Sequence, residues 1–384
     1  MSHNPQPSAN SSLPQQTAAR LHDAGAALET IPVLVGFDGF IDTIYHAVDT
    51  RQSATEYTRI ETLEAFGRRI VAAAGKSTNV EIVPQNVKLG GNGPIMAFAL
   101  SCLGAPLTYC GMTGYPHTHE VFAEFARRAQ LLPISEPALT DAYEFDDGKL
   151  IVGKHATVAE VSYDNIMQRV GDSQWRAAWE NARCVGMVNW TMLPHLTDLW
   201  KRLLLDDGAL PQTRKTLFFD LADPEKRTEQ DLHEALDTIA AFQQSHDVIL
   251  GLNEKESLQV ADALAVPITF SESMAQGETS PEMIVELAAA IRARLGIHTC
   301  VVHPTRYAAG ADATGASMVP GPFIANPKIS TGAGDHFNAG FCAGHLIGCD
   351  LAQSLQLGVA TSGYYVRHAA SPNREQLGEF LRSL

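Results

Sequence analysis

Short apolar runs alternate with longer segments of helical pattern through the second half of this 384-residue chain. The apolar runs have the length of buried strands, and the segments between them carry apolar residues at helical spacing. Strands are predicted at 184–188, 216–220, 248–252 and 299–302, and helices at 193–205, at 229–243, from Glu254 onward, and at 281–295. This alternation is typical of βαβ units, so the sequence predicts an α/β fold with a doubly wound, mostly parallel sheet.

The first half continues this pattern and then departs from it. Strands are predicted at 31–37 and 107–112, and helices at 61–75, 95–104 and 118–130. The segment 143–152 predicts a β-hairpin instead, because Asp147-Gly148 supports a tight turn with positive φ. A hairpin inside an α/β pattern suggests a flap outside the main sheet. We therefore expect about 43–60 and 141–163 to form a small β lid over the site, whose open edge could pair with a second copy of the chain.

Composition and charge limit where such a protein acts. Residues 1–19 are rich in Ser, Pro, Gln and Asn and lack the apolar stretch of a secretory signal, so we expect a disordered tail before one domain over 20–384. The net charge of −15 repels nucleic acid and anionic membranes. No apolar run reaches the roughly 18 residues needed to cross a bilayer. The six cysteines have no zinc-like spacing and are interpreted as reduced core residues. A cytoplasmic protein without nucleic-acid or membrane partners is predicted.

The segment 329–337 combines small residues with an acid at the predicted start of a helix. Ser330 and Thr331 are suited to cap that helix. Free N–H groups and the helix dipole at such a start bind anions. A carboxylate there repels the anion, so folding alone does not favour Asp335 at this position. We interpret Asp335 as a base that takes a proton from an attacking hydroxyl group.

Polar side chains also follow the ends of several predicted strands. These are Asp38 and Asp42 after the first strand, and Asp220 with Asp223 and Asn253 with Glu256 in the second half. Ligands of open α/β sheets bind at the carboxyl ends of the strands, so we expect these groups along one edge. Acids there can bind acceptor hydroxyl groups, and carboxylates with an amide suit Mg²⁺. Each group also has a structural interpretation, as a turn acid or a helix cap.

An ordered set of motifs gives the chain a strong resemblance to the ribokinase-like PfkB family of carbohydrate kinases. A di-glycine at 90–91 opens a helix that ends in Leu-Gly at 103–104, an N-x-x-E follows at 253–256, and G-A-G-D-x-F closes the set at 332–337. By itself the di-glycine is equally well explained by a plain turn. The resemblance covers roughly residues 31–370 and implies a three-layer α-β-α ribokinase-like fold.

The resemblance also implies roles for individual residues. Asp335 would be the catalytic base, and Gly332, Ala333 and Gly334 would form an anion hole for the phosphoryl group. Asn253 and Glu256 would organise Mg²⁺ and the nucleotide phosphates, largely through water. The implied acceptor-binding residues are Asp38, Asp42, Gly90, Gly91 and Asn92, and the implied nucleotide-binding residues are Asn253, Thr305, Arg306 and Asn338.

Three stretches depart from the family pattern. Ile329-Ser330 replace an Asp-Thr pair whose acid binds potassium in some members, so monovalent-cation activation of that kind is not expected. Ile95 stands where the di-glycine helix usually carries Asn, with Asn92 as a substitute. His-Pro-Thr-Arg at 303–306 replaces Thr-Leu-Gly, and Arg306 either reaches the nucleotide phosphates or is solvated.

Together these features predict an ATP-dependent kinase that transfers the γ-phosphoryl group to a hydroxyl group of a sugar or sugar-like acceptor, with Mg²⁺ as cofactor. A nucleoside kinase is the first alternative, and it would stack its acceptor on Phe37, Phe40 or Trp190. A non-catalytic nucleotide- or sugar-sensing protein of the same fold is the second. ADP as phosphoryl donor is the third, because the spacing of Asp38 and Asp42 faintly resembles the ADP-dependent branch.

Overall fold

The centre of the molecule is a mostly parallel sheet flanked by helices. The computed structural model describes residues 12–207, 213–267 and 279–384, and within them one nine-stranded sheet has the order β14-β13-β12-β11-β10-β9-β1-β5-β6. Its strands are β1 (Val33–Phe37), β5 (Leu107–Gly111), β6 (Ala129–Pro133), β9 (Cys184–Met187), β10 (Thr216–Asp220), β11 (Asp247–Leu252), β12 (Thr299–Val302), β13 (Tyr307–Asp312) and β14 (Gly315–Pro320). Within this sheet the β12–β13 and β13–β14 pairs are antiparallel, and the other neighbouring strands pair parallel. The predicted doubly wound, mostly parallel sheet is confirmed.

Helices cover both faces of this sheet because its strands are apolar on both faces. In β10, Leu217 and Phe219 join one core cluster and Phe218 joins the other. The helices on the Phe218 side are α1 (Leu13–Ala24), α3 (Asn92–Cys102), α4 (Ala123–Ala126), α11 (Ala333–Leu346), α12 (Leu351–His368) and α13 (Arg374–Ser383). Those on the other side are α5 (Tyr163–Arg169), α6 (Asp172–Asn181), α7 (Leu196–Asp207), α8 (Glu229–Ala241), α9 (Glu254–Ala263) and α10 (Pro281–Leu295). The result is the predicted three-layer arrangement.

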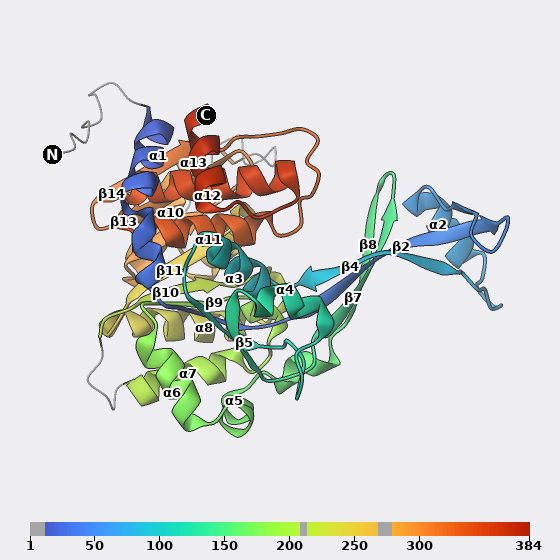
Figure 1. Cartoon of the computed structure of the whole chain (residues 1–384), viewed down its shortest axis with the longest axis horizontal. Coiled ribbons are helices and arrows are strands. Elements are labelled where there is room, and N and C mark those ends of the chain that lie inside the picture. The colour runs from blue at the N-terminus through green and yellow to red at the C-terminus, as the bar shows by residue number, and fades with distance from the viewer. Residues whose placement is uncertain (1–11, 208–212, 268–278) are drawn as a thin grey trace.

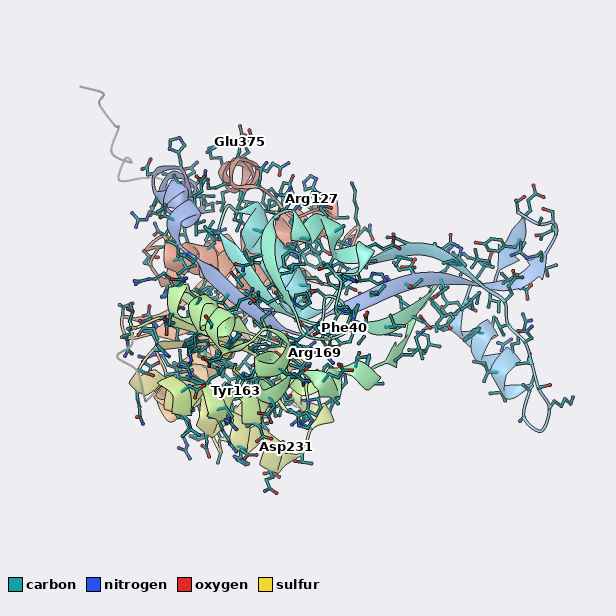
Figure 2. The ribbon with its side chains drawn as sticks, turned by 60° about the horizontal axis from the view of Figure 1, so that its bottom comes forward. Phe40, Arg127, Tyr163, Arg169, Asp231 and Glu375 are labelled. Carbon is teal, nitrogen blue, oxygen red and sulfur yellow. The ribbon has the colours of Figure 1, made fainter. Side chains whose placement is uncertain are left out.

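A second, five-stranded sheet projects away from this body, as Figure 1 shows. It contains β2 (Phe40–Arg51), β3 (Tyr57–Arg59), β4 (Ile82–Gly90), β7 (Ala138–Phe145) and β8 (Gly148–Lys154). The helix α2 (Leu63–Val71) packs on its distal end, where the Phe66 and Phe145 rings lie 5.3 Å apart. Figure 2 shows Phe40 at the base of this projection, where it joins the body. The predicted hairpin is therefore present, as β7 and β8.

Several sequence-based boundaries are wrong. The helix α1 begins at Leu13, so residues 13–19 are not a disordered tail; residues 1–11 lie outside the described part of the chain. The predicted helix at 118–130 is only a short turn plus α4, because β6 follows at Ala129. The small sheet also includes β4, which was not predicted as a strand because Pro84 interrupts its apolar pattern. Val161, assigned to the lid, is instead buried in the core of the body.

Two further expectations concern the cysteines and the membrane. All six cysteines are free, and four of them, Cys110, Cys184, Cys300 and Cys342, are buried, as expected for reduced core residues. In the described parts of the chain, no helix combines the length and the apolar character that crossing a bilayer requires.

Candidate active site

The segment that was predicted to form an anion hole contains the start of α11. Gly332 is the residue that precedes the helix and adopts a left-handed backbone with φ of 89°. No side chain caps this helix, so the prediction that Ser330 or Thr331 caps it is wrong. The Ala333 N–H donates to the Ser330 carbonyl at 3.1 Å. Gly334 and Asp335 occupy the next two positions of the first turn, where N–H groups have no partner within a helix. The donors open to an anion are therefore those of Gly334 and Asp335 rather than that of Ala333.

Asp335 lies in this first turn and is only 7% exposed. Burial raises its pKa well above the ordinary value, and the charges of Asp220 and Asp38 raise it further. A hydrogen bond from the Asn92 side chain acts in the opposite direction and favours the carboxylate. The structure therefore brings Asn92 to Asp335 across 243 positions of sequence, which supports the substitution of Asn92 for the usual Asn of this helix.

Asp38 holds the start of α3. Its carboxylate accepts hydrogen bonds from the Asn92 N–H at 2.9 Å, from the Gly93 N–H at 2.8 Å and from Asn189 Nδ2 at 2.6 Å. Tyr109 adds a longer contact at 3.4 Å. Burial raises the pKa of Asp38 to about 6 even though these donors lower it. With its oxygens bonded to protein donors, Asp38 fits the structural interpretation better than direct contact with an acceptor.

Asp42 lies further along β2, at the base of the small sheet. In the sheet register it pairs with Lys88 on one side and Thr140 on the other. Burial raises its pKa, while the Lys88 charge and a hydrogen bond from Thr140 lower it. A Cβ atom at Gly90 would overlap the Asp42 carboxylate, so glycine at position 90 leaves room for this side chain. Gly91 then immediately precedes α3, as the di-glycine pattern predicted.

Tyr365 is a site residue that the sequence did not indicate. Burial, together with the charges of Asp335 and Asp42, raises its pKa to about 12, so the ring lies near both of these acids. Tyr365 comes from α12, which lies after the last motif of the family pattern. From the sequence alone, a tyrosine within an amphipathic helix is interpreted as a core residue. Only the packing of α12 against α11 places it here.

Asn253 and Glu256 form a reciprocal capping pair at the start of α9. Asn253 Oδ1 accepts from the Glu256 N–H at 2.9 Å, and Glu256 Oε2 accepts from the Asn253 N–H at 2.8 Å. Glu256 Oε1 also accepts from the Asp223 N–H at 2.9 Å. The structural interpretation of this motif is thus correct for both side chains. The Glu256 carboxylate nevertheless lies close enough to Asp335 and Asp220 for its charge to raise the pKa of both.

Asp220 and Asn338 complete this acidic edge. Asn338 Nδ2 donates to Asp220 Oδ2 at 2.9 Å. The other oxygens of the pair, Asp220 Oδ1 and Asn338 Oδ1, are buried without a hydrogen-bond partner in the described structure. Asp223 points elsewhere and pairs with Lys226 and Lys255, each at 3.0 Å.

This edge fits a hydrated divalent cation. Two unpaired buried oxygens and a set of mutually repelling carboxylates are the surroundings that Mg²⁺ would neutralise. Within the described residues, no group of three or more acidic, His or Cys side chains could hold a metal ion by itself. A cation here would therefore keep waters and share phosphate oxygens, and the indirect role of Glu256 and Asn253 stays a prediction.

The charge of Asp220 should make the stability of the protein depend on pH. Its pKa is raised from 3.8 to about 8, first by burial and then by the charge of Glu256. The folded state thus binds more protons than the unfolded state between these values, and the stabilisation is complete below 3.8 and lost as the pH rises to about 8. Without Mg²⁺ and nucleotide, we expect the free energy of unfolding to fall by about 1 kcal/mol per pH unit between about pH 6 and about pH 8.

Urea denaturation of the wild-type protein and of Asp220→Asn at several pH values measures this dependence. The variant should give a flatter profile, because the amide does not titrate. An equally steep profile in Asp220→Asn would show that another group is responsible.

A cavity of about 380 Å³ adjoins the other side of the α11 start. Its lining includes Asn253, Thr305, Phe323, Gly334 and Phe337, together with residues of α12. Its walls are largely apolar, and it meets the anion-hole turn at Gly334, as a site for a nucleotide base and its phosphates would. Thr305, which was predicted to bind the nucleotide, is among the residues that line it.

Arg306 and His303 lie beside this cavity. Arg306 was expected either to reach the nucleotide phosphates or to be solvated, and His303 had no predicted role. The Arg306 guanidinium stacks 3.9 Å from the centroid of the Phe323 ring and is not part of the lining. The position of Arg306 favours an exposed, stacked arginine over a phosphate contact. The His303 ring lies 4.7 Å from that of Phe337, and burial lowers its pKa to about 4, so it is neutral at physiological pH.

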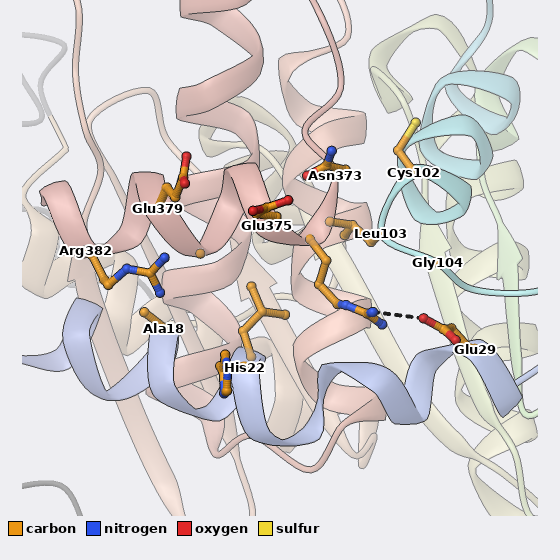
Figure 3. Close-up of a pocket in the computed structure, with 13 residues that line it drawn as sticks. Ala18, His22, Glu29, Cys102, Leu103, Gly104, Asn373, Glu375, Glu379 and Arg382 are labelled. Carbon is orange, nitrogen blue, oxygen red and sulfur yellow. Dashed lines mark hydrogen bonds and ion pairs between the residues drawn. The ribbon is translucent and has the colours of Figure 1, made fainter. Parts of the chain in front are cut away.

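A larger cavity of about 590 Å³ lies elsewhere, between α1, α13 and the end of α3. Figure 3 shows its mixed lining of acidic and basic side chains. Among them, Arg374 pairs with Glu29 at 2.8 Å. None of the predicted site residues lines it. Choosing the active site by cavity volume alone would therefore give a cavity that none of the predicted catalytic or binding residues line.

Solved structures share this fold. The chain is similar to a carbohydrate kinase from Agrobacterium tumefaciens, with a TM-score of 0.61 and 19% identity over 92% of this chain and 97% of that one. It is also similar to a mutant of phosphofructokinase-2 from Escherichia coli, with a TM-score of 0.61, 13% identity and coverage of 92% and 99%. The ribokinase of Arabidopsis thaliana, solved with ribose and ATP, gives a TM-score of 0.59, 16% identity and coverage of 92% and 99%.

The fold and the residues at this edge place the protein in the class of ribokinase-like carbohydrate kinases of the PfkB type, as the motifs predicted. Sequence comparison is more specific. The family model described as prokaryotic ketohexokinase matches residues 15–383, and the ketohexokinase of Haloferax volcanii is 30% identical over 377 residues, or 96% of each chain. The chain belongs to the prokaryotic ketohexokinase family, and it is a sugar kinase.

Proposed function

We propose that this protein transfers the γ-phosphoryl group of ATP to a hydroxyl group of a ketohexose. The observation that carries the proposal is the position of Asp335. It lies in the first turn of α11, next to Gly334, which lines the cavity suited to a nucleotide, and its carboxylate is bonded to Asn92 at the start of α3. One group thus touches the phosphate side and the acceptor side of the site. The ketohexose is suggested by the family and by the Haloferax volcanii relative.

The chain's own residues suit each part of this transfer. Asp335 takes the proton of the acceptor hydroxyl as its oxygen bonds to the γ-phosphorus, and the bond from that phosphorus to the β–γ bridging oxygen breaks to release ADP. The N–H groups of Gly334 and Asp335 donate to the phosphoryl oxygens as charge develops on them. Asp42, with Thr140 and Lys88 beside it, orients the sugar hydroxyl groups. Glu256, Asn253 and Asp220 would hold Mg²⁺ at this edge, and the ion would supply positive charge that neutralises the phosphates.

The buried aromatic rings argue against a nucleoside acceptor. Phe37, Phe40 and Trp190 are 1%, 6% and 0% exposed, and all three belong to the core of the body. The Arg227 guanidinium also lies 4.5 Å from the centroid of the Trp190 ring. None of the three presents a free face on which a base could stack.

A substrate survey tests the function directly. Purified protein is assayed with Mg²⁺ and either ATP or ADP, on ketohexoses, aldohexoses, ribose, polyols and adenosine. We expect ATP to be the donor and one ketohexose to exceed glucose and adenosine in kcat/KM by about 100-fold. Fastest turnover with adenosine would favour the nucleoside kinase, and ligand binding without turnover would favour the sensing protein.

We also propose that the small sheet pairs with a second copy of the chain. By register, Val87, Leu139 and Val152 share the face opposite Asp42, and they are 50%, 41% and 43% exposed. An apolar strip of this kind on a projecting sheet with free edges favours self-association. Light scattering should give a dimer mass for the wild-type protein and a monomer mass for Val152→Lys. The matched change Ile151→Lys, on the other face, should leave the dimer intact; a monomeric wild-type protein would refute the pairing.

A further inference from the structure

A stacked pair of aromatic side chains lies directly behind the anion-hole turn. The His336 ring lies 3.6 Å from that of Tyr365, centroid to centroid, with 13° between the planes. His336 follows the base Asp335 in α11, and Tyr365 comes from α12. Neither side chain has a role in the proposed transfer so far. We infer that His336 is a positioning residue that, together with Tyr365, fixes the orientation of the anion-hole turn.

The first support is that the pair binds two successive carbonyl groups of the turn. His336 Nδ1 lies 2.7 Å from the Gly332 carbonyl oxygen, and the Tyr365 hydroxyl donates to the Thr331 carbonyl at 3.0 Å. The His336 backbone N–H also donates to Gly332 at 3.1 Å. In a planar trans peptide the C=O and the next N–H point in opposite directions. Holding these two carbonyls therefore fixes the planes of the 331–332 and 332–333 peptides, and these peptides directly precede the Gly334 and Asp335 N–H groups that are open to an anion.

The second support is that the hydrogen-bond directions of His336 are determined. A carbonyl oxygen can only accept, so Nδ1 carries the proton toward Gly332. Nε2 lies 2.8 Å from Ser371 Oγ. Burial lowers the pKa of His336 to about 4, so the ring is neutral and Nε2 accepts from the Ser371 hydroxyl. In this tautomer the imidazole donates to the Gly332 carbonyl of the turn and accepts from Ser371, which follows α12. The ring therefore links these two segments in one orientation.

The third support is the close packing that brings α12 within reach. A Cβ atom at Gly340 would lie 2.6 Å from the Leu357 carbonyl oxygen, and one at Gly344 would lie 3.0 Å from the Ser354 Cα atom. These glycines and His336 are four residues apart on one face of α11. The His336–Tyr365 stack thus lies at the end of the close contact between α11 and α12. It connects this tightly packed contact to the turn. The backbone bond from Lys328 N–H to the Val366 carbonyl, at 2.8 Å, ties the same loop to α12.

The test uses His336→Ala, His336→Asn and Tyr365→Phe, with His345→Ala as the matched control. His345 is a largely buried histidine of the same helix, and it contacts Thr216 and the His298 ring at the far end from the turn. The inference rests on the proposed phosphoryl transfer, so two readouts are taken. One is steady-state kinetics with ATP and the ketohexose. The other is hydrogen exchange of peptides that span 328–337, which does not depend on any substrate.

For His336→Ala we expect kcat to fall by about 10- to 100-fold with an acceptor KM within about twofold of the wild type. Exchange across 328–337 should become roughly tenfold faster. His336→Asn should recover most of both, because its amide can donate to Gly332 in place of Nδ1. Tyr365→Phe should show a smaller change of the same kind, and His345→Ala should change neither readout.

Unchanged exchange in His336→Ala would overturn the inference, as would an equal loss of kcat in His345→Ala or no recovery in His336→Asn. If the wild-type protein phosphorylates no ketohexose, the proposed function fails, but the exchange data still decide whether His336 holds the turn.

Discussion

Asp335→Asn should lose phosphoryl transfer by about 100- to 10,000-fold while keeping its affinity for nucleotide. The amide cannot take the proton of the attacking hydroxyl group, but it has the same size and still fits beside Asn92. The pKa of Asp335 is raised by burial and by Asp220 and Asp38, so the wild-type carboxylate is under electrostatic strain in the absence of ligand. Removing that charge should leave the melting temperature unchanged or higher.

Single-turnover kinetics and calorimetric titration with ATP analogues separate the two effects. The same elevated pKa predicts that wild-type kcat/KM declines with falling pH at values where an ordinary aspartate would still be ionised. Asp223→Asn is the matched control, because Asp223 is paired with Lys226 and Lys255 away from the transfer. Turnover within a few-fold of wild type in Asp335→Asn would exclude the proposed base, whatever the acceptor is.

Gly332→Ala should reduce kcat by about 100-fold or more. Gly332 has a φ of 89°, and a Cβ atom there would lie 3.3 Å from Ile95 and from the Tyr365 hydroxyl. A left-handed L-residue costs about 1–2 kcal/mol, so the turn should relax and move the donors of Gly334 and Asp335 away from the phosphoryl oxygens. Binding of adenosine, which lacks phosphates, should weaken less than binding of ATP.

Gly296→Ala separates backbone strain from misplacement of the anion hole. Gly296 also has a positive φ, 66°, at the end of α10, and a Cβ atom there would meet nothing within 4 Å. It should lose a similar amount of stability in urea denaturation with kcat unchanged. If both variants lost activity alike, or if Gly332→Ala kept wild-type kcat, the turn would not be the anion hole.

Local patterns in the sequence predicted the parts of the site that depend on chain neighbours. The turn, the helix and the acid at 332–335 come from consecutive residues, and so does the reciprocal cap of Asn253 and Glu256. The periodicity of apolar residues predicted most strands of the main sheet. It failed where an element was short or irregular, as for α4, β4 and β6, because a few residues do not define a period.

The sequence by itself determined the reaction class: its ordered motifs predicted a PfkB-type kinase fold, and Asp335 as its base. Only the tertiary structure decided which groups surround Asp335. Asn92 reaches Asp335 because Asp38 holds the start of α3, and Tyr365 reaches the turn because glycines let α12 approach α11. Such contacts join residues far apart in the chain. They depend on how helices pack against a sheet, and no local repeat in the sequence encodes that packing.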